Sequence, residues 1–186
     1  MIERAPPVAE RPIERVIDAL WDGVPPGAAL YAVFDGARDA RIVPSVARSG
    51  LEQRCLYDGR LPRELVEAAP HLLRLDRAAP ATSALLRDGW GRSWGIFLAS
   101  TTPLDPLRRH LRRFLRVRDE DGRRLLFRYY DPRVLRVFLP TCTPDELAQL
   151  FGPIDRFLVE ADAASLLIFR FAGALETTRR ALEAAC

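Results

Sequence analysis

The chain has 186 residues, and its hydrophobic fraction of 48% and charged fraction of 28% are ordinary for one globular domain. These values exclude a largely disordered chain and leave little room for a second full domain. All 28 basic residues are arginine. Residues 107–136 hold eleven of them against four acidic residues, a net charge of +7, so the chain is a near-neutral body with one basic segment.

The sequence lacks the features of several protein classes. Its cysteines, Cys55, Cys142 and Cys186, are odd in number and far apart, which disfavours a disulfide framework and a structural zinc site. No segment reaches the roughly 18 apolar residues of a membrane span, and the charged N-terminus is unlike a signal peptide. We therefore predict a cytoplasmic protein with no metal, no cofactor and no membrane partner.

The first half of the chain alternates predicted helices and strands. Residues 1–12 are charged and rich in proline, which predicts a flexible lead-in to a single domain over residues 13–186. Apolar spacing predicts three helices, at 13–20, 62–69 and 81–88. It also predicts three strands, at 30–34, 71–75 and 96–99. The alternation indicates an α+β (mixed α/β) fold, a mixed β-sheet packed by several short helices.

Residues 104–118 predict a short amphipathic helix with an apolar seam. Five arginines fall on the side opposite the seam: Arg108, Arg109, Arg112, Arg113 and Arg116. Like charges three and four residues apart destabilise a helix by about 0.2–0.5 kcal/mol per pair. These arginines therefore require acidic neighbours in the same domain, a protein partner or a nucleic acid, and the spacing alone leaves all three open.

The second half of the chain contains clear turn signals. Asp119–Gly122 separates 114–118 from 124–130, which predicts a strand pair joined by a loop. Asp131 precedes Pro132 and a helical turn, so we expect its carboxylate to fix that turn or to pair with an arginine. The remaining predictions are a helix that begins at a Thr143–Glu146 capping box, strands at 156–160 and 165–171, and a helix over 175–184.

No arrangement of residues predicts an enzyme. His110, Asp131 and Cys142 could form a cysteine-hydrolase triad, but their spacing gives no support for one. The motifs of nucleotide-binding loops, dinucleotide sites, zinc proteases and serine hydrolases are absent. The glycine-rich loop at 89–95 leads into a strand, so its Trp90 and Trp94 fit core packing or a protein contact better than a phosphate cradle.

A nucleic-acid-binding module that uses the basic segment 107–136 is the alternative function. Phe127, Tyr129 and Tyr130 lie within this segment and could stack on bases. Acidic residues at 119–121 and the absence of a helix-turn-helix or RNA-binding motif count against this function.

Six short motifs occur in an order that matches one known family. The most specific is RYYDPRVL at 128–135, and the others are LYAVFDG (30–36), WGIFL (94–98), LRRHLRRFL (107–115), LP (139–140) and FGP (151–153). Over residues 28–160 the chain resembles the domain-of-unknown-function family of type VI secretion adaptor chaperones, also called Tap or Tec proteins.

The resemblance implies a non-enzymatic adaptor. Such a protein binds a toxic effector in the cytoplasm and helps to load it onto the VgrG spike, without itself being exported. Exposed guanidinium groups suit a contact that must hold a client and later release it. We therefore expect partner contacts at Arg108, Arg109, Arg112, Arg113, Arg116, Arg128, Arg133, Trp90 and Trp94.

Overall fold

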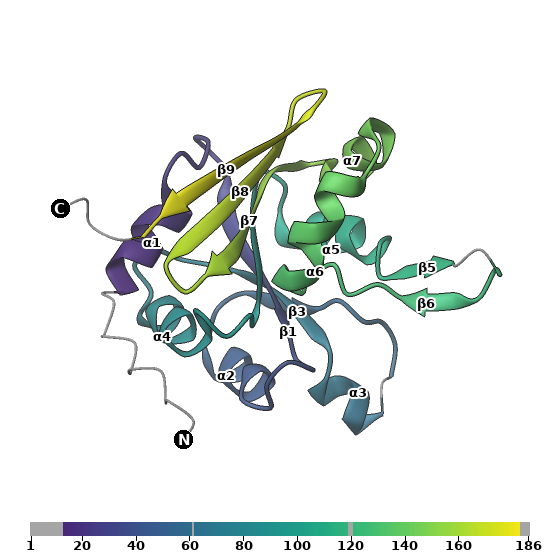
Figure 1. The fold of residues 1–186 in the computed structure, drawn as a ribbon. Coiled ribbons are helices and arrows are strands. Elements are labelled where there is room, and N and C mark those ends of the chain that lie inside the picture. Colours follow the sequence, from purple (N-terminus) through teal and green to yellow (C-terminus); the bar gives the residue numbers. More distant parts are fainter. Residues whose placement is uncertain (1–12, 61, 119–120, 183–186) are drawn as a thin grey trace, which may run out of the picture.

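A seven-stranded β-sheet runs through the centre of the molecule (Figure 1). The computed structural model describes residues 13–60, 62–118 and 121–182. Each neighbouring pair of strands in this sheet is antiparallel. In spatial order the strands are β2 (Gln53–Cys55), β3 (Pro70–Arg74), β1 (Ala29–Asp35), β4 (Gly95–Ser100), β7 (Ile154–Asp162), β8 (Ser165–Phe171) and β9 (Leu175–Ala181).

Helices cover both faces of the sheet. On one face lie α1 (Ile13–Trp21), α2 (Ile42–Arg48) and α4 (Pro80–Gly89), and on the other lie α5 (Leu104–Arg112), α6 (Pro132–Phe138) and α7 (Pro144–Phe151). A short helix, α3 (Arg63–Glu67), connects β2 to β3, and a 3-10 turn, Leu139–Thr141, follows α6. Strands β5 (Arg116–Arg118) and β6 (Arg124–Leu126) form a separate hairpin that projects from the body (Figure 1).

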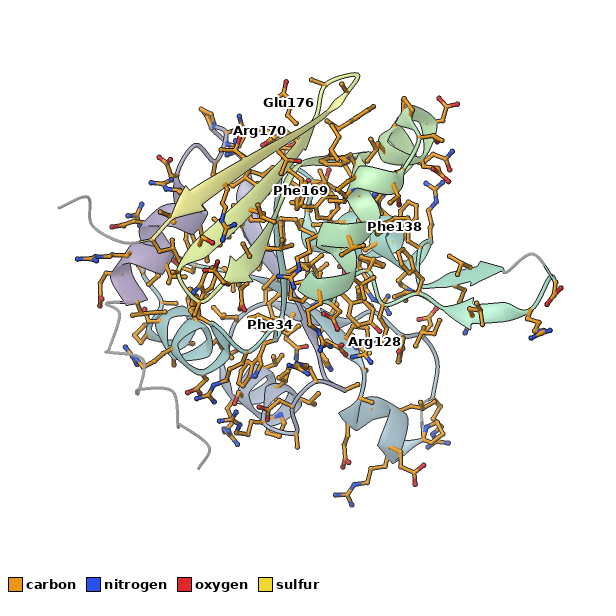
Figure 2. The ribbon with its side chains drawn as sticks, in the orientation of Figure 1. Phe34, Arg128, Phe138, Phe169, Arg170 and Glu176 are labelled. Carbon is orange, nitrogen blue, oxygen red and sulfur yellow. The ribbon has the colours of Figure 1, made fainter. Side chains whose placement is uncertain are left out.

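Strand β1 is buried on both faces, and its side chains alternate between two cores. Leu30, Ala32 and Phe34 pack with α1, α2 and α4, whereas Tyr31 and Val33 pack with α5, α6 and α7. A strand covered on both sides has no solvent-facing positions, which explains its continuous apolar run. Figure 2 shows side chains filling the spaces on both sides of the sheet.

The structure confirms the predicted fold class, an α+β fold in which short helices pack on a sheet. The sheet was predicted to be mixed, but the pairings between its described strands are all antiparallel. The predicted strands and helices of the first half all form, with shifts of one or two residues at most ends. The capping box that begins α7 is also present, because the Thr143 side chain accepts from the Glu146 backbone and the Glu146 carboxylate accepts from the Thr143 backbone. The predicted lead-in over residues 1–12 lies outside the described residues.

Two predictions for the second half were wrong. The helix predicted over 175–184 is strand β9, because residues 175–181 pair with β8 across a turn at Gly173 and this pairing outweighs local helix propensity. The amphipathic helix ends at Arg112, well before residue 118, because the backbone N–H of Phe127 donates to the Leu115 carbonyl and starts the hairpin ladder. Helix α2 and strand β2 were not predicted.

Among the described residues, no helix combines the length and the apolar character needed to cross a membrane.

Helix α5 is held against the sheet by its apolar seam, which consists of Leu104, Leu107 and Leu111. Leu107 is fully buried, so replacement by alanine leaves a cavity, and we expect Leu107→Ala to lower the free energy of unfolding by about 2–5 kcal/mol. Arg109→Ala, on the exposed side of the same helix, should change it by less than about 0.5 kcal/mol. Urea unfolding of both variants measures the difference, and equal losses would contradict this account of the seam.

Candidate partner-binding surface

The apolar seam of α5 determines which of its side chains reach solvent. Leu104, Leu107 and Leu111 are buried against the sheet at the i, i+3, i+7 spacing of one helix face. The arginines at 108, 109, 112 and 113 therefore point away from the core, as predicted from the sequence. Their surroundings differ. Some of these arginines bind groups of the same chain, and others have no ion-pair partner among the described residues.

Arg108 and Arg112 hold the loop that follows β2. The guanidinium of Arg108 donates to the carbonyl oxygens of Cys55 and Tyr57, at 2.6 and 3.0 Å. Arg112 forms an ion pair with Asp58 at 2.7 Å, and its hydrogen bond to this carboxylate lowers the pKa of Asp58. Two of the five arginines on the predicted face thus bind the protein's own backbone and acid.

Arg109, Arg113 and Arg116 are exposed, and within the described part of the chain none of them has an ion-pair partner. Arg113 lies over the ring of Phe114, with 5.9 Å between the guanidinium carbon and the ring centroid. Arg116 is the first residue of β5 and lies on the hairpin rather than on the helix. These three positive charges remain available to an anionic group from outside the chain.

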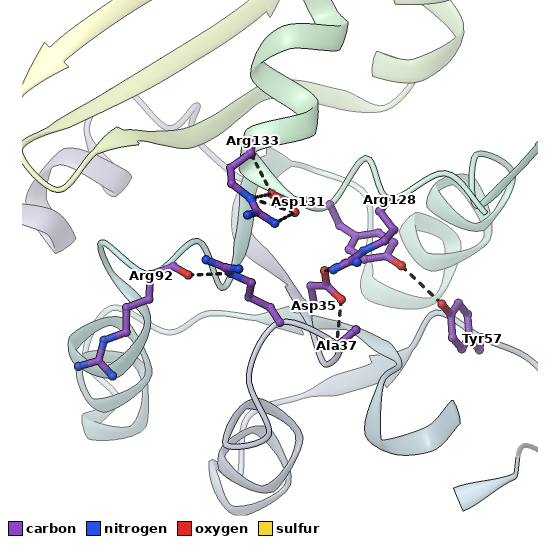
Figure 3. Close-up of polar contacts among 9 residues, drawn as sticks. Asp35, Ala37, Tyr57, Arg92, Arg128, Asp131 and Arg133 are labelled. Atoms are coloured by element: carbon purple, nitrogen blue, oxygen red, sulfur yellow. Dashed lines mark hydrogen bonds and ion pairs between the residues drawn. The ribbon is translucent and has the colours of Figure 1, made fainter. Parts of the chain in front are cut away.

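Arg128 is committed to a buried carboxylate. Asp35, at the end of β1, has 1% of its side-chain surface exposed and forms an ion pair with Arg128 (Figure 3). Its other oxygen accepts from the backbone N–H of Ala37 at 3.1 Å. Arg128 was predicted to contact a partner, but a guanidinium that compensates a buried charge has a structural role first.

Asp131 caps helix α6 and pairs with Arg133, as expected from its position before Pro132. Its carboxylate accepts from the backbone N–H of Arg133 at 2.9 Å and from the guanidinium of the same residue at 2.6 Å (Figure 3). Burial raises the pKa of Asp131, but the hydrogen bonds from Arg133 outweigh burial and the pKa is lowered. The cap thus occupies the guanidinium of Arg133, although this side chain is half-exposed.

Trp90 and Trp94, which were predicted to anchor a partner, both pack within the domain. Trp94 is 1% exposed and packs edge-on against Phe34, with 6.2 Å between ring centroids. Trp90 is half-buried, and its indole N–H donates to the Ala163 carbonyl at 3.2 Å. Trp94 therefore belongs to the core, and it offers no surface to a partner.

His110, Asp131 and Cys142, the residues of the possible cysteine-hydrolase triad, each bond to a different group and not to one another. The His110 ring bonds to the Leu150 carbonyl at 2.9 Å, and the Cys142 thiol donates to the Phe138 carbonyl at 3.4 Å. Asp131 is engaged by Arg133. Burial lowers the pKa of His110 and raises that of Cys142, which favours a neutral imidazole and a protonated thiol. Across the described residues, no group of three or more histidine, cysteine or acidic side chains could hold a metal ion.

The aromatic residues of the basic segment are not positioned to stack on bases. Tyr129 and Tyr130 are 0% and 1% exposed. Phe127 is half-buried and packs against Phe138, with 4.7 Å between ring centroids. A stacking platform requires exposed ring faces, so this segment offers charge to a nucleic acid and little else.

Sequence reasoning missed the exposed apolar residues of the β5–β6 hairpin. Val117, Leu125 and Leu126 have 39%, 47% and 52% of their surface exposed. They account for half of the large hydrophobic side chains that lie exposed in the described residues; Leu65, Val66 and Val137 are the others. The hairpin was predicted, but an apolar run in a strand gave no signal that the strand would leave the core.

Glu160, on β7, was also missed and is nearly buried. Its carboxylate accepts from the backbone N–H of Ser93 at 3.2 Å, and Ser93 adopts a positive φ of 56°. Burial raises the pKa of Glu160 to about 7, which the backbone hydrogen bond offsets only in part. The only sequence signal was an acidic residue at the end of a predicted strand.

Comparison with known proteins finds a family whose model matches most of this fold. The model of a family described as "Domain of unknown function (DUF4123)" matches residues 30–149, which run from β1 into α7. Among curated proteins and among solved structures, no match was found.

The buried carboxyl of Glu160 predicts a pH dependence of stability. Its pKa rises from 4.5 in the unfolded chain to about 7 in the fold, so between these values the folded state binds more protons. The free energy of unfolding should therefore fall by roughly 3 kcal/mol as the pH rises from 4.5 to 7, and this contribution should be absent in Glu160→Gln. Urea unfolding at pH 5, 6, 7 and 8 measures the difference between the two proteins.

Comparing variant with wild type is necessary because burial lowers the pKa of His71 and His110, which changes stability in the opposite direction over part of this range. Glu176→Gln, which alters an exposed carboxylate on β9, serves as the control and should keep the wild-type pH profile. A Glu160→Gln profile parallel to that of wild type would contradict the prediction.

Proposed function

The chain belongs to the DUF4123 family, whose model matches well over half of its residues, and we propose that it is a type VI secretion adaptor that binds a toxic effector and promotes its loading onto the VgrG spike. In this proposal the protein is not an enzyme. It acts in the cytoplasm by holding one protein and presenting it to another. The proposal rests on the family resemblance and on the surface described above.

The motifs behind the resemblance build the part of the fold that carries this surface. LYAVFDG covers residues 30–35 of β1, which ends at Asp35. RYYDPRVL supplies Arg128, which binds Asp35, and Asp131, which caps α6. LRRHLRRFL forms α5. These motifs have clear structural roles, so their presence together supports a shared fold and, with it, a shared way of presenting the surface.

The observation that carries the proposal is a group of three exposed arginines close together in the sequence, Arg109, Arg113 and Arg116, none of which has an ion-pair partner among the described residues. A guanidinium binds a carboxylate through two parallel hydrogen bonds, which gives direction and specificity. Because such contacts are partly screened by salt and water, they permit release as well as binding. An adaptor that transfers a client requires both properties.

A nucleic-acid-binding module is the second candidate, since the same arginines lie in a segment with a net charge of +7. Its affinity should fall steeply as salt rises, because each neutralised phosphate releases about one counterion. Absence of binding to duplex DNA and to single-stranded RNA at 50 mM salt would eliminate this candidate.

Co-purification tests the adaptor proposal directly. The full chain would be co-expressed with any VgrG spike protein and any toxin encoded near its gene, the toxin together with its immunity protein. We expect a complex that contains the chain and at least the toxin. If neither the spike protein nor the toxin is recovered with the chain, while circular dichroism shows the chain to be folded, the proposal is contradicted.

Charge reversal should separate the partner surface from the fold. Arg109→Glu with Arg113→Glu changes two exposed side chains that have no ion-pair partner among the described residues, so we expect it to weaken partner binding by about tenfold or more and to leave the melting temperature within about 3 °C. Isothermal titration calorimetry and thermal unfolding measure the two effects.

The matched control reverses two exposed arginines on the opposite face of the sheet. Arg15→Glu with Arg87→Glu, on α1 and α4, makes the same change in net charge. We expect this variant to bind like wild type. If both double variants lose affinity equally, net charge rather than the α5 surface governs binding, and the assignment of Arg109 and Arg113 fails.

A further inference from the structure

The β5–β6 hairpin exposes apolar side chains on both of its faces. Val117 and Leu125 face each other across the two strands, and so do Arg116 and Leu126. Because strand side chains alternate between faces, the first pair shares its face with Leu115 and Phe127, which pack into the core. This face is thus an outward extension of the core, and in the described part of the chain it stays partly exposed at Val117 and Leu125.

The edges of the hairpin are also free. Of the strands that the structure describes, β5 and β6 pair only with one another, so each has one side without a neighbouring strand. A two-stranded hairpin by itself is marginally stable in water, and three or more strands with a covered apolar face are the stable arrangement. An added strand would complete both the ladder and the apolar face.

The root of the hairpin is rigidly attached. The backbone N–H of Phe127 donates to the Leu115 carbonyl at 2.9 Å, and the Phe127 ring packs on Phe138 of α6. One residue later, Arg128 binds the buried Asp35. The exposed strands therefore extend from a fixed base.

Charge indicates what binds there. Arg116 lies on β5 and Arg113 lies three residues before it, both exposed, and residues 113–126 hold five arginines against three acids, a net charge of +2. A second copy of this chain on the hairpin would bring two such segments together, which like-charge repulsion opposes. A nucleic acid complements the arginines, but its backbone offers no apolar surface to Val117, Leu125 and Leu126, and the stacking rings are buried.

From these observations we propose that the β5–β6 hairpin is a docking site for an extended, acidic segment of a partner protein, which adds as a strand beside the hairpin. Alternate side chains of the segment would be aliphatic, covering Val117 and Leu125, and acidic, meeting Arg113 and Arg116. The proposal rests on the adaptor function and adds to it the chemistry of the client: a strand of alternating aliphatic and acidic residues.

A defined peptide tests this proposal without knowledge of the natural client. A fluorescein-labelled peptide of alternating valine and glutamate is titrated with the full chain, and fluorescence anisotropy reports binding. We expect saturable binding to wild type. Val117→Ser with Leu125→Ser should weaken it by about tenfold, whereas Leu65→Ser with Val66→Ser, at exposed apolar positions of α3, should leave it unchanged.

A second variant distinguishes the loss of a binding contact from unfolding of the hairpin. Arg116→Glu changes one exposed side chain and should weaken the valine–glutamate peptide by a similar factor while strengthening a valine–lysine peptide. Absence of binding to wild type, or equal affinity of all variants, would overturn the proposal. So would binding of the valine–lysine peptide to wild type as tight as that of the acidic one.

Other occupants are distinguished by the same assay. Tighter binding to a 20-base-pair DNA duplex or to phosphatidylglycerol vesicles, lost in Val117→Ser with Leu125→Ser, would overturn the proposal in favour of that ligand. Self-association through the hairpin in analytical ultracentrifugation would do the same. If the acidic peptide binds as expected but neither spike nor toxin co-purifies, the adaptor function fails and the docking site stands; the reverse result removes only the docking site.

Discussion

The ion pair between Asp35 and Arg128 joins strand β1, at the centre of the sheet, to the segment that links the β5–β6 hairpin to helix α6. Asp35 ends β1, the strand buried on both faces, and its carboxylate has almost no contact with solvent. A buried carboxylate without a positive partner is strongly destabilising, so the fold requires Arg128 at this point. Arg128 lies two residues after β6 and three before the Asp131 cap of α6, and it therefore fixes both the base of the hairpin and the start of the helix.

Arginine is the only basic residue type in this chain, yet it performs two different tasks. Arg108, Arg112, Arg128 and Arg133 bind carbonyl oxygens or acids of the same domain and hold loops, a strand end and a helix cap in place. Arg109, Arg113 and Arg116 have no such partner among the described residues. The difference depends on which acidic side chains and backbone carbonyl oxygens lie near each guanidinium in three dimensions.

That dependence explains how far sequence reasoning could go. The seam of α5 was predictable because helical periodicity is local, and the turn at Asp131 was predictable because the capping acid and proline are adjacent. The partner of Arg128 is 93 residues away in the chain, and no local pattern indicates it. Strand β9 was mistaken for a helix for the same reason, since only pairing with β8 distinguishes residues 175–181 from a helical segment. The exposure of Val117 and Leu125 likewise depends on where the body of the domain ends.

The fixed base of the hairpin and the exposed Val117 and Leu125 on its strands have consequences for binding. Because Arg128 and Phe127 fix the base of the hairpin, a partner strand would meet backbone edges that are already extended, and less conformational entropy would be lost on association. Aliphatic contacts at Val117 and Leu125 would then provide most of the affinity, and arginines beside them would select acidic partners and speed the encounter. Salt weakens the second contribution more than the first. On such a surface the apolar residues would set the affinity for a client, and the arginines would set the selectivity for acidic clients.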